Sequence, residues 1–370
     1  MVGNKVPIET VRDRTIDIAK GVAIIAIVLG HVLRGLGSAG LIDSTSGTYV
    51  MSDRALYIGH LTVFAFLSGL FVARGVDKDG AASYLRGRLG NFLYLYLVWQ
   101  TLQVSVKLGT ASLVNSAPDL AALYEIWKPE GQMWFLPWLI IATCLTVLMQ
   151  PWKRTGVAWA GMLVIAMTSL ASWGQGGSYI GVQGLSLIIF FFIGARIRFD
   201  RLSTVLAGMR GVHLIIVAWG SFAIYANVLL WTDGMPPTVD APWTFTGVGF
   251  GLLASAAGVA GVLSISALFS RLSRGFGWLT FVGKRSLEIF LAHIIAASGA
   301  RIVLETLGLQ DAAFHIVAGV ALGIIGPLIL WFVLSRMGFV WLFQRPTAQQ
   351  LFKSHIEAGP SHKVEASSES

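Results

Sequence analysis

Cysteine is nearly absent from this chain of 370 residues, which contains a single copy, Cys144. One thiol cannot close an intramolecular disulfide, and it cannot supply the several thiolates of a metal cluster. Charged residues are also scarce, at 12% of the sequence, whereas 55% of the residues are hydrophobic. The mean hydropathy of +0.70 lies above the range of soluble globular proteins. The composition therefore excludes a soluble domain and predicts an integral membrane protein.

The hydrophobic residues come in runs of about 20, the length that an α-helix needs to cross the ~30 Å hydrocarbon core of a bilayer. They do not alternate with polar residues, as the strands of a transmembrane barrel do. We therefore predict an all-α fold, a polytopic membrane bundle of about ten transmembrane helices. The predicted spans are 16–36, 53–73, 91–108, 132–150, 156–173, 181–198, 211–231, 246–270, 279–300 and 313–335.

The basic residues are distributed unevenly between the two sides of this predicted bundle. If the N-terminus lies in the cytoplasm, most of the 27 Lys and Arg residues fall in cytoplasmic segments, as the positive-inside rule requires. Both termini are then cytoplasmic. The net charge of +8 is thereby explained by topology, and we expect membrane lipid rather than nucleic acid around the protein.

The segments between the predicted spans are too short to fold as separate domains. We therefore predict one integral membrane domain over residues 1–345, with the connecting segment 74–90 lying at the cytoplasmic interface. Residues 346–370 are predicted to form a disordered cytoplasmic tail, because their polar sequence cannot bury a core. The N-terminus lacks a cleavable signal pattern, so the first span is expected to be retained.

The first predicted span carries polar residues inside the stretch TIDIAKGVAIIAIVLGHVLRG, namely Asp17, Lys20, His31 and Arg34. Hydrocarbon tolerates such groups only when they are paired, reach the surface or face a polar cavity. On an α-helix Lys20 and His31 point within ~20° of each other, and Asp17 falls near the same face. One interpretation is a polar passage along this face. The alternative is that Asp17 and Lys20 anchor the helix at the interface and His31 packs in the core.

The second predicted span favours the passage, because it places His60 at a depth similar to that of His31. Two imidazoles that share a site of low dielectric constant disfavour each other's protonation, so at least one should stay neutral near pH 7. A neutral imidazole can accept a proton, as a general base does. No third ligand stands at helical spacing from either histidine, so we expect no metal.

Other polar and aromatic residues lie in or beside the later spans. Glu288 and His293 in GKRSLEIFLAHI point to opposite sides of one helix. Trp134 in QMWFLPW fits an aromatic belt at the membrane interface, beside a tolerated proline kink. The glycine of FLSGLF, beside Ser68, allows a close approach of two helices.

Four basic residues, Arg74, Lys78, Arg86 and Arg88, cluster between the second and third predicted spans. Most such clusters fix the orientation of the protein and contact anionic lipid. A minority bind phosphate groups, for which the guanidinium fork of arginine is suited.

The stretches RTIDIAKGVAIIAIVLGH, HLTVFAFLSGLF, WFLPWL and GKRSLEIFLAH occur in this order and together resemble the acyltransferase-3 family of membrane proteins, most closely its fucose 4-O-acetylase-like branch. The opening pattern of that family matches Asp17, Lys20, Gly21 and His31. Thr62 stands where the branch has a proline. The family's Arg-x-x-Arg pair is represented here only by Arg86 and Arg88.

This resemblance implies a bacterial inner-membrane O-acetyltransferase, which moves an acetyl group from acetyl-CoA onto a hydroxyl of a cell-surface or secreted glycan. Residues 1–345 are then its acyltransferase domain, and acetyl-CoA is a co-substrate rather than a bound cofactor. The acceptor is expected to be a carbohydrate or lipid-linked glycan, such as a fucose or another sugar of a polysaccharide or lipo-oligosaccharide. The alternative is a glycan exporter or flippase that uses the same polar passage without chemistry.

The residues expected to serve the reaction fall into three groups. The resemblance makes His31 catalytic, and we place two further residues with it, His60 and Asp17. The residues expected to bind the phosphates of the coenzyme are Lys20, Arg74, Arg86 and Arg88. The residues expected to contact the acceptor are Ser68, Trp134, Glu288 and His293.

Overall fold

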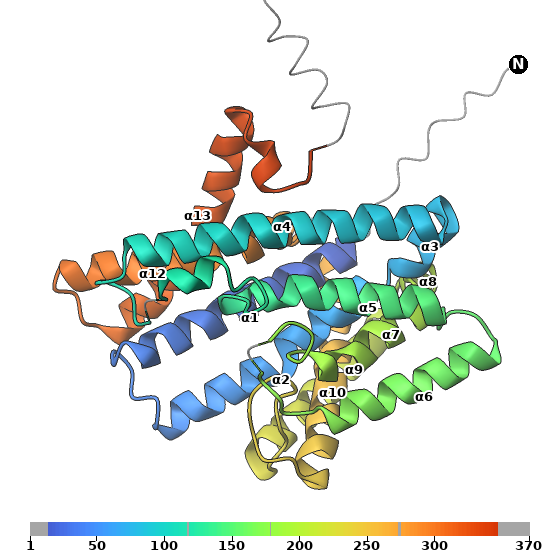
Figure 1. Ribbon diagram of the computed structural model, residues 1–370. Helices are drawn as coiled ribbons and strands as arrows, with labels where there is room; N and C mark the ends of the chain where they lie inside the picture. The colour runs from blue at the N-terminus through green and yellow to red at the C-terminus, as the bar shows by residue number, and fades with distance from the viewer. Residues whose placement is uncertain (1–13, 117, 178, 273–274, 347–370) are drawn as a thin grey trace, which may run out of the picture.

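The computed structural model describes residues 14–346, with the exception of 117, 178, 273 and 274. Within these residues the chain forms thirteen α-helices and four short 3₁₀ turns, and no β-strand (Figure 1). The predicted all-α fold is thus confirmed. The predicted tail 346–370 lies outside the described residues except for its first position.

Most of the helices follow one another with short connections. The helices are α1 (Arg14–Ser38), α2 (Gly47–Gly69), α3 (Val72–Asp79), α4 (Ala81–Gly109), α5 (Phe135–Met149), α6 (Gly156–Ala171), α7 (Ile188–Ile197), α8 (Phe199–Gly208), α9 (Gly211–Trp231), α10 (Phe245–Arg271), α11 (Gly277–Lys284), α12 (Ser286–Thr306) and α13 (Ala312–Arg336). Longer segments join α4 to α5, α6 to α7 and α9 to α10. The 3₁₀ turns are Leu120–Leu123, Gly131–Trp134, Leu185–Leu187 and Val340–Leu342.

Seven helical segments of the described chain are long and apolar enough to cross a membrane: α1, α2 continued by α3, α5 with the turn before it, α9, α10, α12 and α13. The other three predicted spans coincide with α4, α6 and α7. Of these, α6 and α7 are shorter apolar helices, and α4 carries several polar residues. The multi-pass membrane fold is therefore confirmed, whereas the number ten stays a prediction.

Contacts between loops join segments that are predicted to lie on the same side of the membrane. On the predicted cytoplasmic side, Arg198 pairs with Asp77 at 2.6 Å, and Arg271 donates to the carbonyl of Met209 at 2.8 Å. On the other side, Arg54 donates to the carbonyl of Thr232 at 2.6 Å. These contacts agree with the alternation of the spans. The side that each terminus faces stays a prediction.

The segment 74–90, which was predicted to connect two spans at the interface, is helical except at Gly80. Helix α3 continues to Asp79, Gly80 turns the chain with a φ of 75°, and α4 begins at Ala81. The left-handed backbone conformation is open to glycine without strain, so one residue suffices for the turn. Arg86 and Arg88 consequently lie on a helix rather than on a loop.

Helix α1 occupies the middle of the bundle, where it packs against α2, α10, α11, α12 and α13 (Figure 1). Its crossing with α11 is close enough to require glycine. A Cβ atom at Gly21 would collide with the carbonyl oxygen of Leu279, and one at Gly283 would collide with that of Asp17. Such contacts replace the hydrophobic effect as the source of helix association within lipid.

Helices α2 and α7 make a second close crossing through a reciprocal pair of glycines. A Cβ atom at Gly69 would collide with the carbonyl oxygen of Phe191, and one at Gly194 would collide with that of Phe66. The predicted role of the FLSGLF glycine in a close helix approach is confirmed. This crossing fixes the C-terminal half of α2, and with it the direction in which the Ser68 side chain points.

We predict that Gly69→Ala destabilises the fold by about 1–3 kcal/mol, because an added methyl group must force α2 and α7 apart. The matched control is Gly220→Ala on α9, where no atom lies within 4 Å of the added Cβ. Thermal unfolding of both purified variants in detergent, followed by the loss of the monodisperse chromatographic peak, measures the difference. Equal melting temperatures for the two variants would show that the crossing is not close.

Candidate active site

The bundle encloses two cavities that share one wall. The outer chamber, of about 210 Å³, lies at the predicted outer side, and its polar lining includes His31, Arg34, Tyr57, His60, Gln132 and Trp134. The inner chamber, of about 190 Å³, lies toward the predicted cytoplasmic side, and its polar lining includes Lys20, Ser68, Tyr84, Arg88, Thr143 and Ser286. The polar face predicted for the first span thus borders real cavities.

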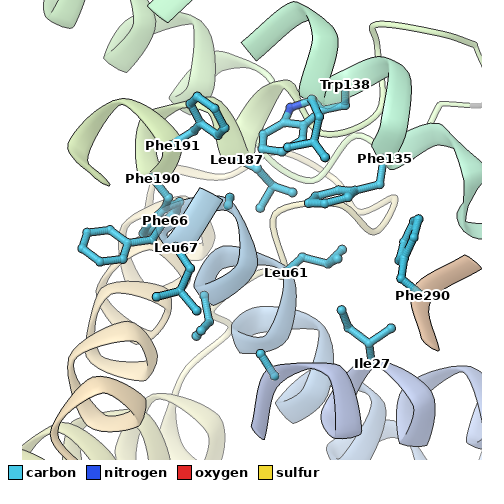
Figure 2. Close-up of a cluster of buried hydrophobic side chains, with 14 of the residues drawn as sticks. Ile27, Leu61, Phe66, Leu67, Phe135, Trp138, Leu187, Phe190, Phe191 and Phe290 are labelled. Atoms are coloured by element: carbon cyan, nitrogen blue, oxygen red, sulfur yellow. The ribbon is translucent and has the colours of Figure 1, made fainter. Parts of the chain in front are cut away.

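The wall between the chambers is apolar. Ile27, Leu61, Phe135 and Phe290 line both cavities, and each of them is less than 8% exposed. Figure 2 shows these four side chains extending from four different helices toward one space. We call this set the waist. A charged or hydrated group pays a desolvation cost there, whereas a small apolar group does not.

Three histidines from three helices meet beside the outer chamber. The ring centroids of His31 on α1 and His293 on α12 are 5.2 Å apart. Tyr57 on α2 lies between the other rings, with its centroid 6.4 Å from that of His31 and 4.7 Å from that of His60. The depth argument therefore placed His31 and His60 in the same cavity, and it did not anticipate the tyrosine between them.

The hydrogen bonds of two of these histidines define their tautomers. Nδ1 of His293 lies 2.9 Å from the carbonyl oxygen of Phe290 and 3.1 Å from that of Ile289. A carbonyl oxygen only accepts, so Nδ1 carries the proton, and Nε2 of the neutral ring is left with a lone pair. This Nε2 is buried and has no hydrogen-bond partner among the described residues. His60 has the same tautomer, because its Nδ1 bonds to the carbonyl of Leu56.

An ion pair holds Tyr57 in place. The guanidinium of Arg34 pairs with both carboxylate oxygens of Asp53, at 2.6 and 2.8 Å. Its central carbon lies 3.4 Å from the centroid of the Tyr57 ring. The positive charge is thus neutralised on one side and stacked on an aromatic face on the other.

Sequence reasoning noticed Arg34 but assigned roles to neither Tyr57 nor Asp53. Tyr57 precedes His60 by three residues, a spacing that places both on one face of α2. This signal could have identified the tyrosine. Asp53 could not be found in this way, because its partner Arg34 lies on a different helix.

The opening of the fourth predicted span completes the outer chamber. Gln132 is 3% exposed and donates through Nε2 to the carbonyl of Phe290 at 3.2 Å. Trp134 is 9% exposed, and its indole Nε1 lies 3.3 Å from the side-chain oxygen of Gln183 when that amide is oriented to accept. Trp134 therefore lies inside the bundle rather than in an interfacial belt.

The inner chamber continues to the surface through a basic opening of about 420 Å³, which includes Arg74, Lys78 and Arg88 in its lining. Phe71, Tyr84 and Arg88 line both spaces. Lys20 reaches the inner chamber with its Nζ 4.9 Å from the centroid of the Phe71 ring. Basic side chains therefore line the space that leads from the surface to the waist.

Four of the predicted site residues lie elsewhere than their predicted roles imply. Arg86 is exposed and does not belong to the lining of the chambers or the basic opening. Asp17 is buried on α1 against α11, outside both chamber linings. Glu288 pairs with Arg285 at 2.9 Å. Ser68, predicted on the acceptor side, lines the inner chamber instead.

The arrangement of possible metal ligands can be stated for the described residues. No group of three or more His, Cys, Asp or Glu side chains is arranged to hold a metal ion in the part of the chain that the structure describes. The neutral imidazoles of the outer chamber have lone pairs that can accept a proton or a hydrogen bond. The site juxtaposes a neutral imidazole, an apolar waist and a basic opening, which suits the transfer of a small group between a phosphorylated donor and a polar acceptor.

Comparison with known proteins places this arrangement in a family. The chain is 28% identical over 137 residues to nodulation protein NolL of Sinorhizobium fredii. That alignment covers 36% of this chain and 35% of the relative, so the chain spans about a third of its length. No solved structure matches the chain. The acyltransferase-3 family model, described as an acyltransferase domain, matches residues 13–336, so this multi-pass membrane protein belongs to the acyltransferase-3 family.

Proposed function

We propose that this protein transfers an acetyl group from acetyl-CoA to a hydroxyl of a carbohydrate or lipid-linked glycan, in the inner membrane of a bacterium. The observation that carries the proposal is the division of the interior into two chambers, each with polar groups in its lining, by an apolar waist. Basic residues gather on one side and histidines on the other. Two substrates of different chemistry can thus approach from opposite sides and meet at the waist.

The donor would occupy the basic opening and the inner chamber. Arg74, Lys78, Arg88 and Lys20 present positive charge along this route, and arginine is suited to phosphate through its fork of donors. Aromatic and aliphatic side chains line the rest of the inner chamber, which suits the neutral arm that carries the thioester. The acetyl group, small and apolar, can then enter the waist.

The acceptor hydroxyl would approach from the outer chamber, where His31 acts as general base. The hydroxyl oxygen attacks the carbonyl carbon of the thioester while His31 takes the hydroxyl proton. The carbon–sulfur bond then breaks, the acetyl group stays on the acceptor oxygen, and the departing thiolate takes the proton from the imidazolium. His60 presents the lone pair of Nε2 to the same chamber and can accept a hydrogen bond from a neighbouring, non-reacting hydroxyl of the acceptor.

His293 would orient His31. Its buried Nε2 has a lone pair and no partner, and its ring centroid is 5.2 Å from that of His31. An N–H of His31 can donate to this nitrogen as the site closes around substrate, which leaves the second nitrogen of His31 free to accept the hydroxyl proton. His293 is therefore a positioning residue, and its predicted contact with the acceptor is replaced in this proposal.

We predict that His31→Ala lowers acyl transfer by about 10²–10⁴-fold, the usual contribution of a general base. The matched control is His213→Ala, which removes an exposed imidazole at the start of α9. Transfer of label from radioactive acetyl-CoA to the glycan fraction of membranes measures the effect. If label transfer by His31→Ala equals that of the control while glycan movement across the membrane continues, the protein is an exporter rather than an enzyme.

Two substitutions of His293 test whether this residue orients His31 or only packs in the core. In His293→Gln the side-chain oxygen takes the place of Nε2, so we expect kcat within about tenfold of wild type. In His293→Asn the polar group takes the place of Nδ1, and kcat should fall by about a hundredfold or more with KM for acetyl-CoA unchanged. Steady-state kinetics of the two variants measure this split. Equal kcat values for both would contradict the positioning role.

The waist predicts selectivity for the length of the acyl group. Leu61→Ala enlarges it, so the ratio of kcat/KM for butyryl-CoA to that for acetyl-CoA should rise about tenfold, as expected for a pocket that gains room for methylene groups. The control is Leu67→Ala on the same helix, where a fully buried leucine outside both chamber linings is truncated. An unchanged ratio in Leu61→Ala would mean that the acyl group does not reach the waist.

A further inference from the structure

A third cavity on the predicted outer side is not used by the donor route or by the histidines. This side cavity, of about 280 Å³, lies between α4 and α12 beside the end of α1. Its lining includes Gln103, Lys107, Asn115, Ser298, Gly299 and Arg301. Its volume is close to the lower end of the range for small-molecule sites, ~300 Å³. The segment above it is fixed to α1, because Asn115 donates to the carbonyl of Gly35 at 3.1 Å.

Gly131 lies between the outer chamber and two residues that line the side cavity. Gly131 lines the outer chamber and is itself exposed. A Cβ atom at Gly131 would lie 3.3 Å from Ile294 Cδ1 and 3.9 Å from Gln103 Oε1, and both of these residues line the side cavity. The φ of 52° at this position favours glycine. The two spaces are thus neighbours across one glycine.

The segment that carries Gly131 is firmly held. The side chain of Gln100 accepts from the backbone N–H of Glu130 at 2.8 Å and donates to the carbonyl of Lys128 at 3.2 Å. Lys107 adds an ion pair with Glu130, with an N···O distance of 2.6 Å. The backbone at Gly131 is therefore held in place between the outer chamber and the side cavity.

The side cavity has polar groups set in a largely apolar lining, and its charges are balanced. Lys107 is paired with Glu130 at 2.6 Å, and Arg301 is paired with Glu305 at 2.9 Å. Because each cation already has a carboxylate, the cavity does not require an anionic ligand. The amide of Gln103, the amide of Asn115 and the hydroxyl of Ser298 offer both donors and acceptors. Hydroxyl groups of a sugar, each of which donates and accepts, match such a lining.

We infer that the side cavity binds the non-reacting sugar units of the glycan acceptor, so that the reacting hydroxyl reaches His31 past Gly131. This inference rests on the proposed function and adds the place where the rest of the acceptor binds. Val106, Ile294 and Ile302 supply an aliphatic wall against which the C–H groups of a sugar ring pack. The donor lies on the other side of the waist and makes no contact with the side cavity.

The test fills the side cavity without disturbing the helix packing. A Cβ atom at Gly299 meets no atom within 4 Å, and the same holds at Gly220, a lipid-side position on α9 outside all the cavities described above. Gly299→Phe and Gly220→Phe therefore form a matched pair. Each variant is expressed in a strain that lacks the gene, and the acetate released by alkali from the surface glycans is measured. The affinity of the purified protein for acetyl-CoA is measured by calorimetry.

We expect Gly299→Phe to lower the glycan acetate about tenfold or more, with its affinity for acetyl-CoA within about twofold of that of Gly220→Phe. Gly299→Ala, which adds only a methyl group, should retain most of the acetate. Equal acetate for the two phenylalanine variants would overturn the inference, and so would a parallel loss of acetyl-CoA binding in Gly299→Phe. A failure of the proposed function is distinguishable, because His31→Ala would then leave the acetate at the wild-type level.

Discussion

The structure depends on the cost of placing polar groups in hydrocarbon. An α-helix satisfies its own backbone in a bilayer, but side chains such as those of Lys20, His31 and Arg34 need a polar surrounding of their own. The bundle meets this requirement by placing α1 at its centre, enclosed by α2 and by α10 to α13. The polar face of α1 then borders the two chambers rather than lipid. The two chambers, the waist and the histidine group all follow from that central position.

Close packing around α1 keeps the chambers separate. The glycine contacts of α1 with α11 and of α2 with α7 bring backbones together, which sets the rotation of α1 and α2 about their axes. That rotation directs Ile27 and Leu61 toward Phe135 and Phe290. The result is two chambers with polar groups in their linings, on either side of a thin apolar barrier. This arrangement suits the proposed transfer, in which donor and acceptor approach the barrier from opposite sides.

Much of the fold could be predicted from the sequence, because hydropathy and length determine where a helix can cross a bilayer. The span predicted over 211–231 coincides with α9, and the depth argument brought His31 and His60 to one cavity. The contacts between helices could not be predicted. The pairing of Arg34 with Asp53, the approach of His293 to His31 and the inward position of Trp134 depend on rotation and tilt, which local periodicity does not encode. For the same reason the positions of Arg86 and Glu288 differ from their predicted roles.

The central claim is that the thioester of the donor reaches the waist from the inner chamber and meets His31 there. A structure of the protein with an acetyl-CoA analogue, in which a methylene group replaces the thioester sulfur, tests this claim most directly. The account predicts the analogue's carbonyl group among Ile27, Leu61, Phe135 and Phe290, with an imidazole nitrogen of His31 facing it from the outer chamber. An analogue that binds with its acetyl group outside the inner chamber, or with the waist between the carbonyl and a distant His31, would contradict the account.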